Sequence, residues 1–167
     1  MNPLKRYTIA GVLFTLTVGT LLHFTYEWSG CNVLVSIVSA VNESVWEHMK
    51  LIFFPILFCS FYLNRKLKKD YPCISSALNF SILLGTLLIP VIFYTYSGIL
   101  GYNTLVLDIG TFFISVLAAF YAVYKLALSC QLQRFRIPLG LAVILLAVCF
   151  TVFTFAPPSG GIFTDPT

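Results

Sequence analysis

The chain has 167 residues, of which 59% are hydrophobic and only 10% are charged, and its mean hydropathy is +0.92. A soluble domain carries about 25% charged residues, so this composition excludes a soluble enzyme or binding module. The net charge of +4 comes from basic residues that alternate with apolar runs. A nucleic-acid surface would interleave them with aromatic residues on one face. We therefore expect the lipid bilayer, and no nucleic acid, as partner.

Five apolar segments follow one another, at about residues 7–28, 33–63, 77–97, 104–128 and 137–155. Each is long enough for the roughly 20 residues that a helix needs to cross a bilayer. The residue-by-residue alternation of a membrane barrel strand is missing. We predict an all-α fold: a polytopic membrane helical bundle of five transmembrane helices, forming a single transmembrane domain over residues 1–167.

The first segment could be mistaken for a signal peptide, because Lys5 and Arg6 precede it. It has no small-x-small cleavage site, however, and it ends in His23 and Glu27. We expect it to be kept as a membrane span.

The second segment, residues 33–63, is too long for one straight crossing, because as a single helix it would extend roughly 46 Å. Ser44 and Glu47 fit the S-x-x-E capping box, in which the serine caps a helix start and the glutamate reaches back. We therefore predict an interruption near Asn42–Ser44, between a short outer piece at about 33–41 and a helix at about 45–63. Irregular backbone at this depth must be buried in protein or line a wet cavity.

The connections around the third, fourth and fifth segments set the orientation. Nine of the ten basic residues lie in alternate connections, as the positive-inside rule predicts: Lys5, Arg6, Arg65, Lys66, Lys68, Lys69, Lys125, Arg134 and Arg136. We expect these connections and the N-terminus in the cytoplasm, and the C-terminus outside it, with the chain in a cytoplasmic (plasma) membrane. The five cysteines show no CxxC spacing, so we predict apolar fillers and neither a disulfide framework nor a zinc knuckle.

Apart from Asp70, in a cytoplasmic connection, the remaining acidic residues, both histidines and Lys50 fall toward the outer side of the membrane. The predicted topology places nine polar residues, from the segment ends and the tail, in the outer half of the bilayer or beyond it. They are His23, Glu27, Asn42, Glu43, Glu47, His48, Lys50, Asp108 and Asp165. Acidic or basic residues at mid-helix cost about 2.5–3.5 kcal/mol each unless they face the bundle interior and pair. We therefore predict one outward-facing polar chamber.

Three kinds of function remain open for this chamber. The first is binding or transport of a cation or proton, with His23, Glu47 and His48 as ligands of a divalent transition metal such as zinc. The second is a membrane-embedded enzyme acting on a lipid-linked or extracytoplasmic substrate. There Glu43, Glu47 and His48 would be catalytic, with Lys50 or Asn42 stabilising the developing charge.

The third is a structural role, in which Glu47 caps a helix and pairs with Lys50, His23 pairs with Glu27, and Asp108 favours a helix N-terminus. No HExxH motif and no GxSxG motif is present. There is also no internal repeat, so alternating-access transport would require a homo-oligomer.

The stretches HFTYEW at 23–28 and VNESVWEHMKLIFFP at 41–55 resemble an uncharacterised family of small multi-pass bacterial membrane proteins. The resemblance covers the whole chain and includes an FxDP tail, formed by Phe163, Asp165 and Pro166. The resemblance implies a bacterial membrane location and points to the same polar residues, but it does not imply any particular activity.

Overall fold

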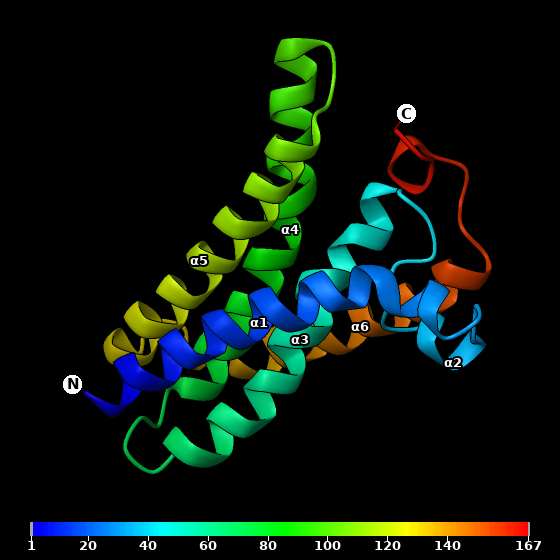
Figure 1. The fold of residues 1–167 in the computed structure, drawn as a ribbon. Helices are drawn as coiled ribbons and strands as arrows, with labels where there is room; N and C mark the ends of the chain where they lie inside the picture. The colour runs from blue at the N-terminus through cyan, green and yellow to red at the C-terminus, as the bar shows by residue number, and fades with distance from the viewer. Residues whose placement is uncertain (1, 167) are drawn as a thin grey trace.

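The computed structural model describes residues 2–166 and is all-helical (Figure 1). No β-strand occurs in these residues. The elements in chain order are α1 (Pro3–Trp28), α2 (Val33–Ser36), α3 (Val45–Leu67), α4 (Ile74–Leu100), α5 (Leu105–Ser129), the 3₁₀ turn η1 (Gln133–Phe135), α6 (Arg136–Phe155) and the 3₁₀ turn η2 (Gly161–Phe163).

Four helical segments are long and apolar enough to cross a membrane: α1, α4, α5, and α6 together with η1. The chain therefore has the helices of a membrane protein. The predicted fifth span is not confirmed, because α3 does not meet the same criterion of length and composition. α3 carries Glu47 and Lys50 in its first two turns and Arg65 and Lys66 in its last.

α3 is the central helix of the bundle. It packs against α1 and α4 and also touches α6 and η2, and α1 crosses in front of it in Figure 1. Ile52, Phe53 and Ile56 on α3 are fully buried. Because neighbouring helices cover most of α3, its side chains need not all be compatible with lipid.

The predicted interruption between residues 33 and 63 is present. α2 ends at Ser36, and α3 begins at Val45 with Ser44 as its N-cap. The Ser44 hydroxyl accepts the Glu47 N–H at 3.4 Å, so the serine half of the capping box forms. The glutamate half does not, because the Asn42 side chain accepts the Ser44 N–H at 3.0 Å, and Glu47 accepts the Val41 N–H at 3.0 Å.

Small residues let α1 lie close to its neighbours. A Cβ atom added to Gly19 would collide with the backbone carbonyl of Leu51 on α3, and one added to Gly11 would collide with the Phe120 ring on α5. The contacts of Gly19 with Leu51 and Phe112 bring the last turns of α1, including His23, close to the first turns of α3 and α5. Small residues at helix contacts commonly allow such approach in membranes.

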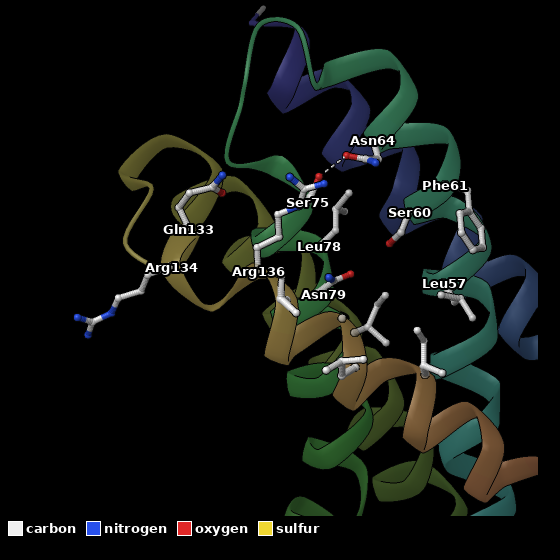
Figure 2. A pocket seen from close by; sticks show the side chains of 15 residues that line it. Leu57, Ser60, Phe61, Asn64, Ser75, Leu78, Asn79, Gln133, Arg134 and Arg136 are labelled. Atoms are coloured by element: carbon white, nitrogen blue, oxygen red, sulfur yellow. Dashed lines mark hydrogen bonds between the residues drawn. The ribbon is translucent and has the colours of Figure 1, made fainter.

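The basic connections meet at one end of the bundle. Asn2, before α1, accepts a hydrogen bond from Tyr71 in the α3–α4 connection at 2.6 Å. Ser75 on α4 donates to Asn64 on α3 at 2.7 Å (Figure 2). We call this the basic end. The opposite end holds the interruption between α2 and α3, the α4–α5 connection and the C-terminal tail.

The prediction that every cysteine is an apolar filler is wrong. Cys73, before α4, and Cys130, after α5, form a disulfide across a sequence separation of 57. The antiparallel packing of α4 on α5 brings these two positions together, which no local spacing could reveal. Disulfides persist mainly in oxidising compartments, whereas the positive-inside rule places the basic end in the cytoplasm. The orientation of the chain therefore stays a prediction.

We expect the close contacts of α1 to make its glycines sensitive to a single methyl group. Gly19→Ala should lower the free energy of unfolding by about 1–3 kcal/mol, because a rigid backbone carbonyl lies in the way. Gly98→Ala is the matched control, since its Cβ would enter open space. Detergent-solubilised protein titrated with a denaturing surfactant measures the difference. Equal stability of both variants would contradict the packing.

The disulfide is testable by thiol counting in the denatured, unreduced protein. Three thiols should react with a maleimide, those of Cys31, Cys59 and Cys149, and all five after reduction. Cys73→Ser should raise the unreduced count by one, because it frees Cys130, whereas Cys59→Ser should lower it by one. Five reactive thiols without reductant would exclude the bond.

Candidate functional site

A buried ion pair lies at the start of α3. Lys50 is fully buried and Glu47 is 2% exposed, and their charged atoms are 2.5 Å apart. The Lys50 ammonium also donates to the Ser36 carbonyl at 2.8 Å and to the Thr154 hydroxyl at 3.0 Å. An ammonium has three N–H donors, so all of them are used.

This ion pair fastens the irregular segment to the bundle. Its contacts reach α2 through Ser36, the interruption through Val41, and α6 through Thr154. On the other side, Ser39 donates to the Leu22 carbonyl on α1 and accepts the Tyr26 N–H at 3.1 Å. Residues 37–44 are therefore held between α1 and α3 although they form no regular helix.

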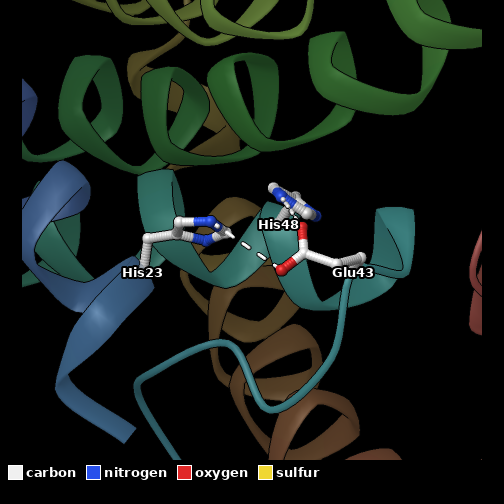
Figure 3. A group of neighbouring side chains, drawn as sticks. All are labelled: His23, Glu43 and His48. Carbon is white, nitrogen blue, oxygen red and sulfur yellow. Dashed lines mark ion pairs between the residues drawn. The ribbon is translucent and has the colours of Figure 1, made fainter. Parts of the chain in front are cut away.

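Three side chains from separate segments meet beside this interruption (Figure 3). His23 comes from α1, Glu43 from the interruption and His48 from α3, and one ligand atom of each lies within 4.8 Å of the others. Glu43 lies between the two imidazoles: Oε1 is 3.8 Å from Nε2 of His23, and Oε2 is 3.4 Å from Nε2 of His48. The ring centroids of the histidines are 5.3 Å apart. We call these residues the His–Glu–His cluster.

The backbone orients one of the two imidazoles. Nδ1 of His48 lies 2.9 Å from the Ser44 carbonyl oxygen, which can only accept a hydrogen bond, so this nitrogen carries the proton. The lone pair of the neutral ring is then on Nε2, which faces Glu43. Metal-binding histidines are commonly oriented by such a bond from their second nitrogen. Nδ1 of His23 is buried without a hydrogen-bond partner among the described residues.

The cluster opens into a cavity of about 260 Å³ between α1, α3, α4 and α5. Asp108 and Thr111 of α5 and Asp165 of the tail line the same cavity. Asp108 accepts a hydrogen bond from the Tyr96 hydroxyl on α4. The Thr111 hydroxyl is buried and has no partner in the described part of the chain. The cavity lining therefore combines three carboxylates, including that of Glu43, with the unpartnered Thr111 hydroxyl.

An aromatic contact brings the tail to this cavity. Phe163 packs on Trp46 of α3, with ring centroids 5.0 Å apart, and on Phe153 of α6 at 5.7 Å. Two residues later, Asp165 and Pro166 reach the cavity wall. Figure 1 shows the C-terminus returning beside the start of α3.

The predicted site residues fall into two groups. His23, Glu43, His48, Asp108 and Asp165 line one cavity. Four others lie elsewhere: Glu47, Lys50, Asn42 and Glu27.

The sequence predicts Glu47 beside the two histidines, but in the structure Glu43 takes that position. Glu47 and Lys50 belong to the buried ion pair, and Asn42 caps a turn by accepting the Ser44 N–H. Glu27 is exposed and outside the cavity lining.

Sequence reasoning missed the partners that lie far along the chain. Thr154 contacts Lys50 across 104 positions, and nothing in its local sequence marks it out. Tyr96 on α4 donates to Asp108, which lines the cavity, but in the sequence it resembles any other interfacial aromatic residue. Thr111 is predictable, because it follows Asp108 by three residues and falls on the same side of the helix.

The chain belongs to a family without an assigned activity. Its whole length, residues 1–167, matches the family described as "Family of unknown function (DUF6512)". No curated protein and no solved structure matches the chain.

The buried ion pair should be structural. Lys50→Met should lower the free energy of unfolding by about 3–5 kcal/mol, because it leaves the Glu47 carboxylate buried without its cation. Lys69→Met, at an exposed position of the basic end, is the matched control and should change it by less than about 0.5 kcal/mol. Surfactant-induced unfolding measures both. A Lys50→Met protein as stable as the wild type would disprove this role.

Proposed function

We propose that this protein is an integral membrane protein whose His–Glu–His cluster binds a divalent transition-metal ion, with zinc as the best match. The observation that supports this proposal most is the convergence of His23, Glu43 and His48 from three separate segments. Imidazole and carboxylate are the ligands that zinc takes beside thiolate.

The spacing of the cluster supports a tetrahedral ion. Ligand atoms held about 2.0–2.2 Å from zinc lie roughly 3.3–3.6 Å from one another in tetrahedral geometry. The carboxylate–imidazole separations are close to this range, at 3.4 Å from Oε2 to His48 and 3.8 Å from Oε1 to His23. One ligand atom of each residue lies within 4.8 Å of the others, so binding of an ion would draw the three side chains closer together. The bond from His48 to the Ser44 carbonyl supplies an orienting contact, and Glu43 brings a negative charge that partly offsets the ion's own.

We also propose that α3 crosses the membrane as a fifth, central helix. Its composition is less apolar than that of α4, α5 and α6, but α1 and α4 cover it. Its buried Glu47–Lys50 pair carries no net charge. With five crossings and the basic end in the cytoplasm of a bacterial cell, the cluster and the C-terminal tail face the extracytoplasmic side.

A metal-dependent enzyme is the second candidate function, and the cavity is the observation that favours it. Three protein ligands leave a fourth position on zinc for water or substrate, as in catalytic sites. Zinc lowers the pKa of a bound water to about 7. Asp165 and Asp108 line the cavity and could accept a proton from it. The substrate class would be a hydrolysable group presented at the extracytoplasmic surface.

A proton relay is the alternative that uses the same cluster without metal, because a carboxylate between two imidazoles can pass a proton between them. Metal binding by purified protein separates the two, since a relay requires no ion.

Zinc titration of chelator-stripped protein tests the proposal. Wild-type protein should bind about one zinc ion per chain, measured by calorimetry and by elemental analysis after desalting. His48→Ala and Glu43→Gln should weaken binding by at least about 100-fold, because each removes a ligand from a site that has three. Glu27→Gln is the matched control, an exposed acid one turn beyond His23 on α1, and should bind as the wild type does.

Two results would overturn the metal proposal. One is folded wild-type protein that binds no zinc, manganese, cobalt or nickel. The other is equal loss of binding in Glu27→Gln and Glu43→Gln, which would indicate diffuse attraction to acidic residues. Stability must be measured in parallel, so that loss of a ligand is separated from loss of the fold.

A further inference from the structure

The basic end contains a second cavity, which the proposed metal site does not use. It lies between α3, α4 and α6 and has a volume of about 720 Å³. Two arginines, Arg134 and Arg136, line it at the basic end, together with five uncharged polar residues: Ser60, Asn64, Ser75, Asn79 and Gln133 (Figure 2). No aspartate or glutamate is among its lining residues.

Several donors in this lining have no acceptor. The Ser60 hydroxyl is buried and unpartnered among the described residues. The Asn64 side-chain oxygen accepts from Ser75, which leaves its N–H₂ group available. Gln133 is oriented in the same way, because its side-chain oxygen accepts from Ser76 at 3.2 Å. Hydrogen-bond donors without acceptors, next to a positively charged arginine, favour the binding of an anion.

Charge and helix ends favour the same ligand. Figure 2 shows Arg136 lying over the cavity and Arg134 turned away from it. α4 and α6 both begin at this end, at Ile74 and Arg136, and neither has a side-chain cap. The first N–H of each helix donates locally, from Ile74 to the Tyr71 carbonyl and from Arg136 to the Gln133 carbonyl. The positive ends of the helix dipoles nevertheless add to the attraction for a negative charge.

The cavity continues into an apolar groove along α3 and α6. A second hollow of about 400 Å³ shares Leu57, Phe61 and Ile144 with the first and extends to Val152. From Arg136 to Val152 the α6 axis runs about 24 Å, more than the roughly 15 Å of one leaflet. With Arg136 at headgroup depth, the shared residues lie at acyl-chain depth, since Ile144 is about 12 Å further along α6.

We propose that this groove is a binding site for an anionic glycerophospholipid. The phosphate lies against Arg136 and the free amide donors, and one acyl chain lies along Leu57, Phe61 and Ile144. Basic pockets between membrane helices bind anionic headgroups at the cytoplasmic surface. The proposal goes beyond the metal site, because the two sites occupy opposite ends of the bundle and share no lining residue.

The test uses the full-length protein in detergent, titrated with phosphatidylglycerol or phosphatidylcholine and analysed by native mass spectrometry. The wild type should bind one phosphatidylglycerol about tenfold more tightly than phosphatidylcholine. Arg136→Gln should remove about tenfold of the phosphatidylglycerol affinity. Lys125→Gln, a basic residue outside the groove lining, is the matched control and should stay within about twofold.

A second variant keeps the proposal falsifiable if Arg136→Gln fails to fold. Ile144→Trp fills the shared apolar section without changing charge, and it should weaken binding of both lipids by about tenfold. Equal affinity for the two lipids, or equal effects of Arg136→Gln and Lys125→Gln, would overturn the proposal. So would Arg136-dependent binding of inorganic phosphate with no effect of Ile144→Trp, since that result describes a site for free phosphate.

Discussion

The Glu47–Lys50 ion pair is the interaction on which the half of the bundle opposite the basic end depends. Burying two charges costs several kcal/mol per ion and is offset only when hydrogen bonds satisfy the remaining donors and acceptors. Here the ammonium has three acceptors from α2, α3 and α6, and the carboxylate also accepts a backbone N–H from the interruption. The pair therefore holds together segments that no regular secondary structure connects.

The interruption determines where the candidate metal ligands meet. A continuous helix through residues 33–63 would carry Glu43 on the face of Glu47, one turn before it. Because the chain leaves the helix after Ser36 and starts again at Val45, Glu43 is free to turn toward His48 and His23. The close approach of α1 at Gly19 then supplies the second imidazole.

The two ends of the bundle have opposite chemistry, and α3 and α6 take part in both. At one end they bear His48 and Thr154, beside carboxylates and imidazoles. At the other they bear Asn64 and Arg136, beside amides and hydroxyls without any acid in the cavity lining. The proposed cation site and the proposed anion site use this separation, and apolar packing around Ile52, Phe53 and Ile56 lies between them.

The sequence by itself determined that the chain is apolar enough for a membrane, that it is all-helical, and that an interruption precedes α3, which Ser44 caps. Composition, the length of apolar runs and capping chemistry are local properties, so they can be read without the fold. It also marked His23, Glu43 and His48 as candidate site residues, because placing an ionisable side chain in an apolar segment costs free energy however the helices pack. Only the tertiary structure decided that Glu43 joins the histidines while Glu47 pairs with Lys50, that Thr154 completes that pair, and that Cys73 bonds to Cys130. The physical reason is that helical periodicity sets the direction of a side chain on its own helix, but which helix lies opposite depends on the packing of the whole bundle.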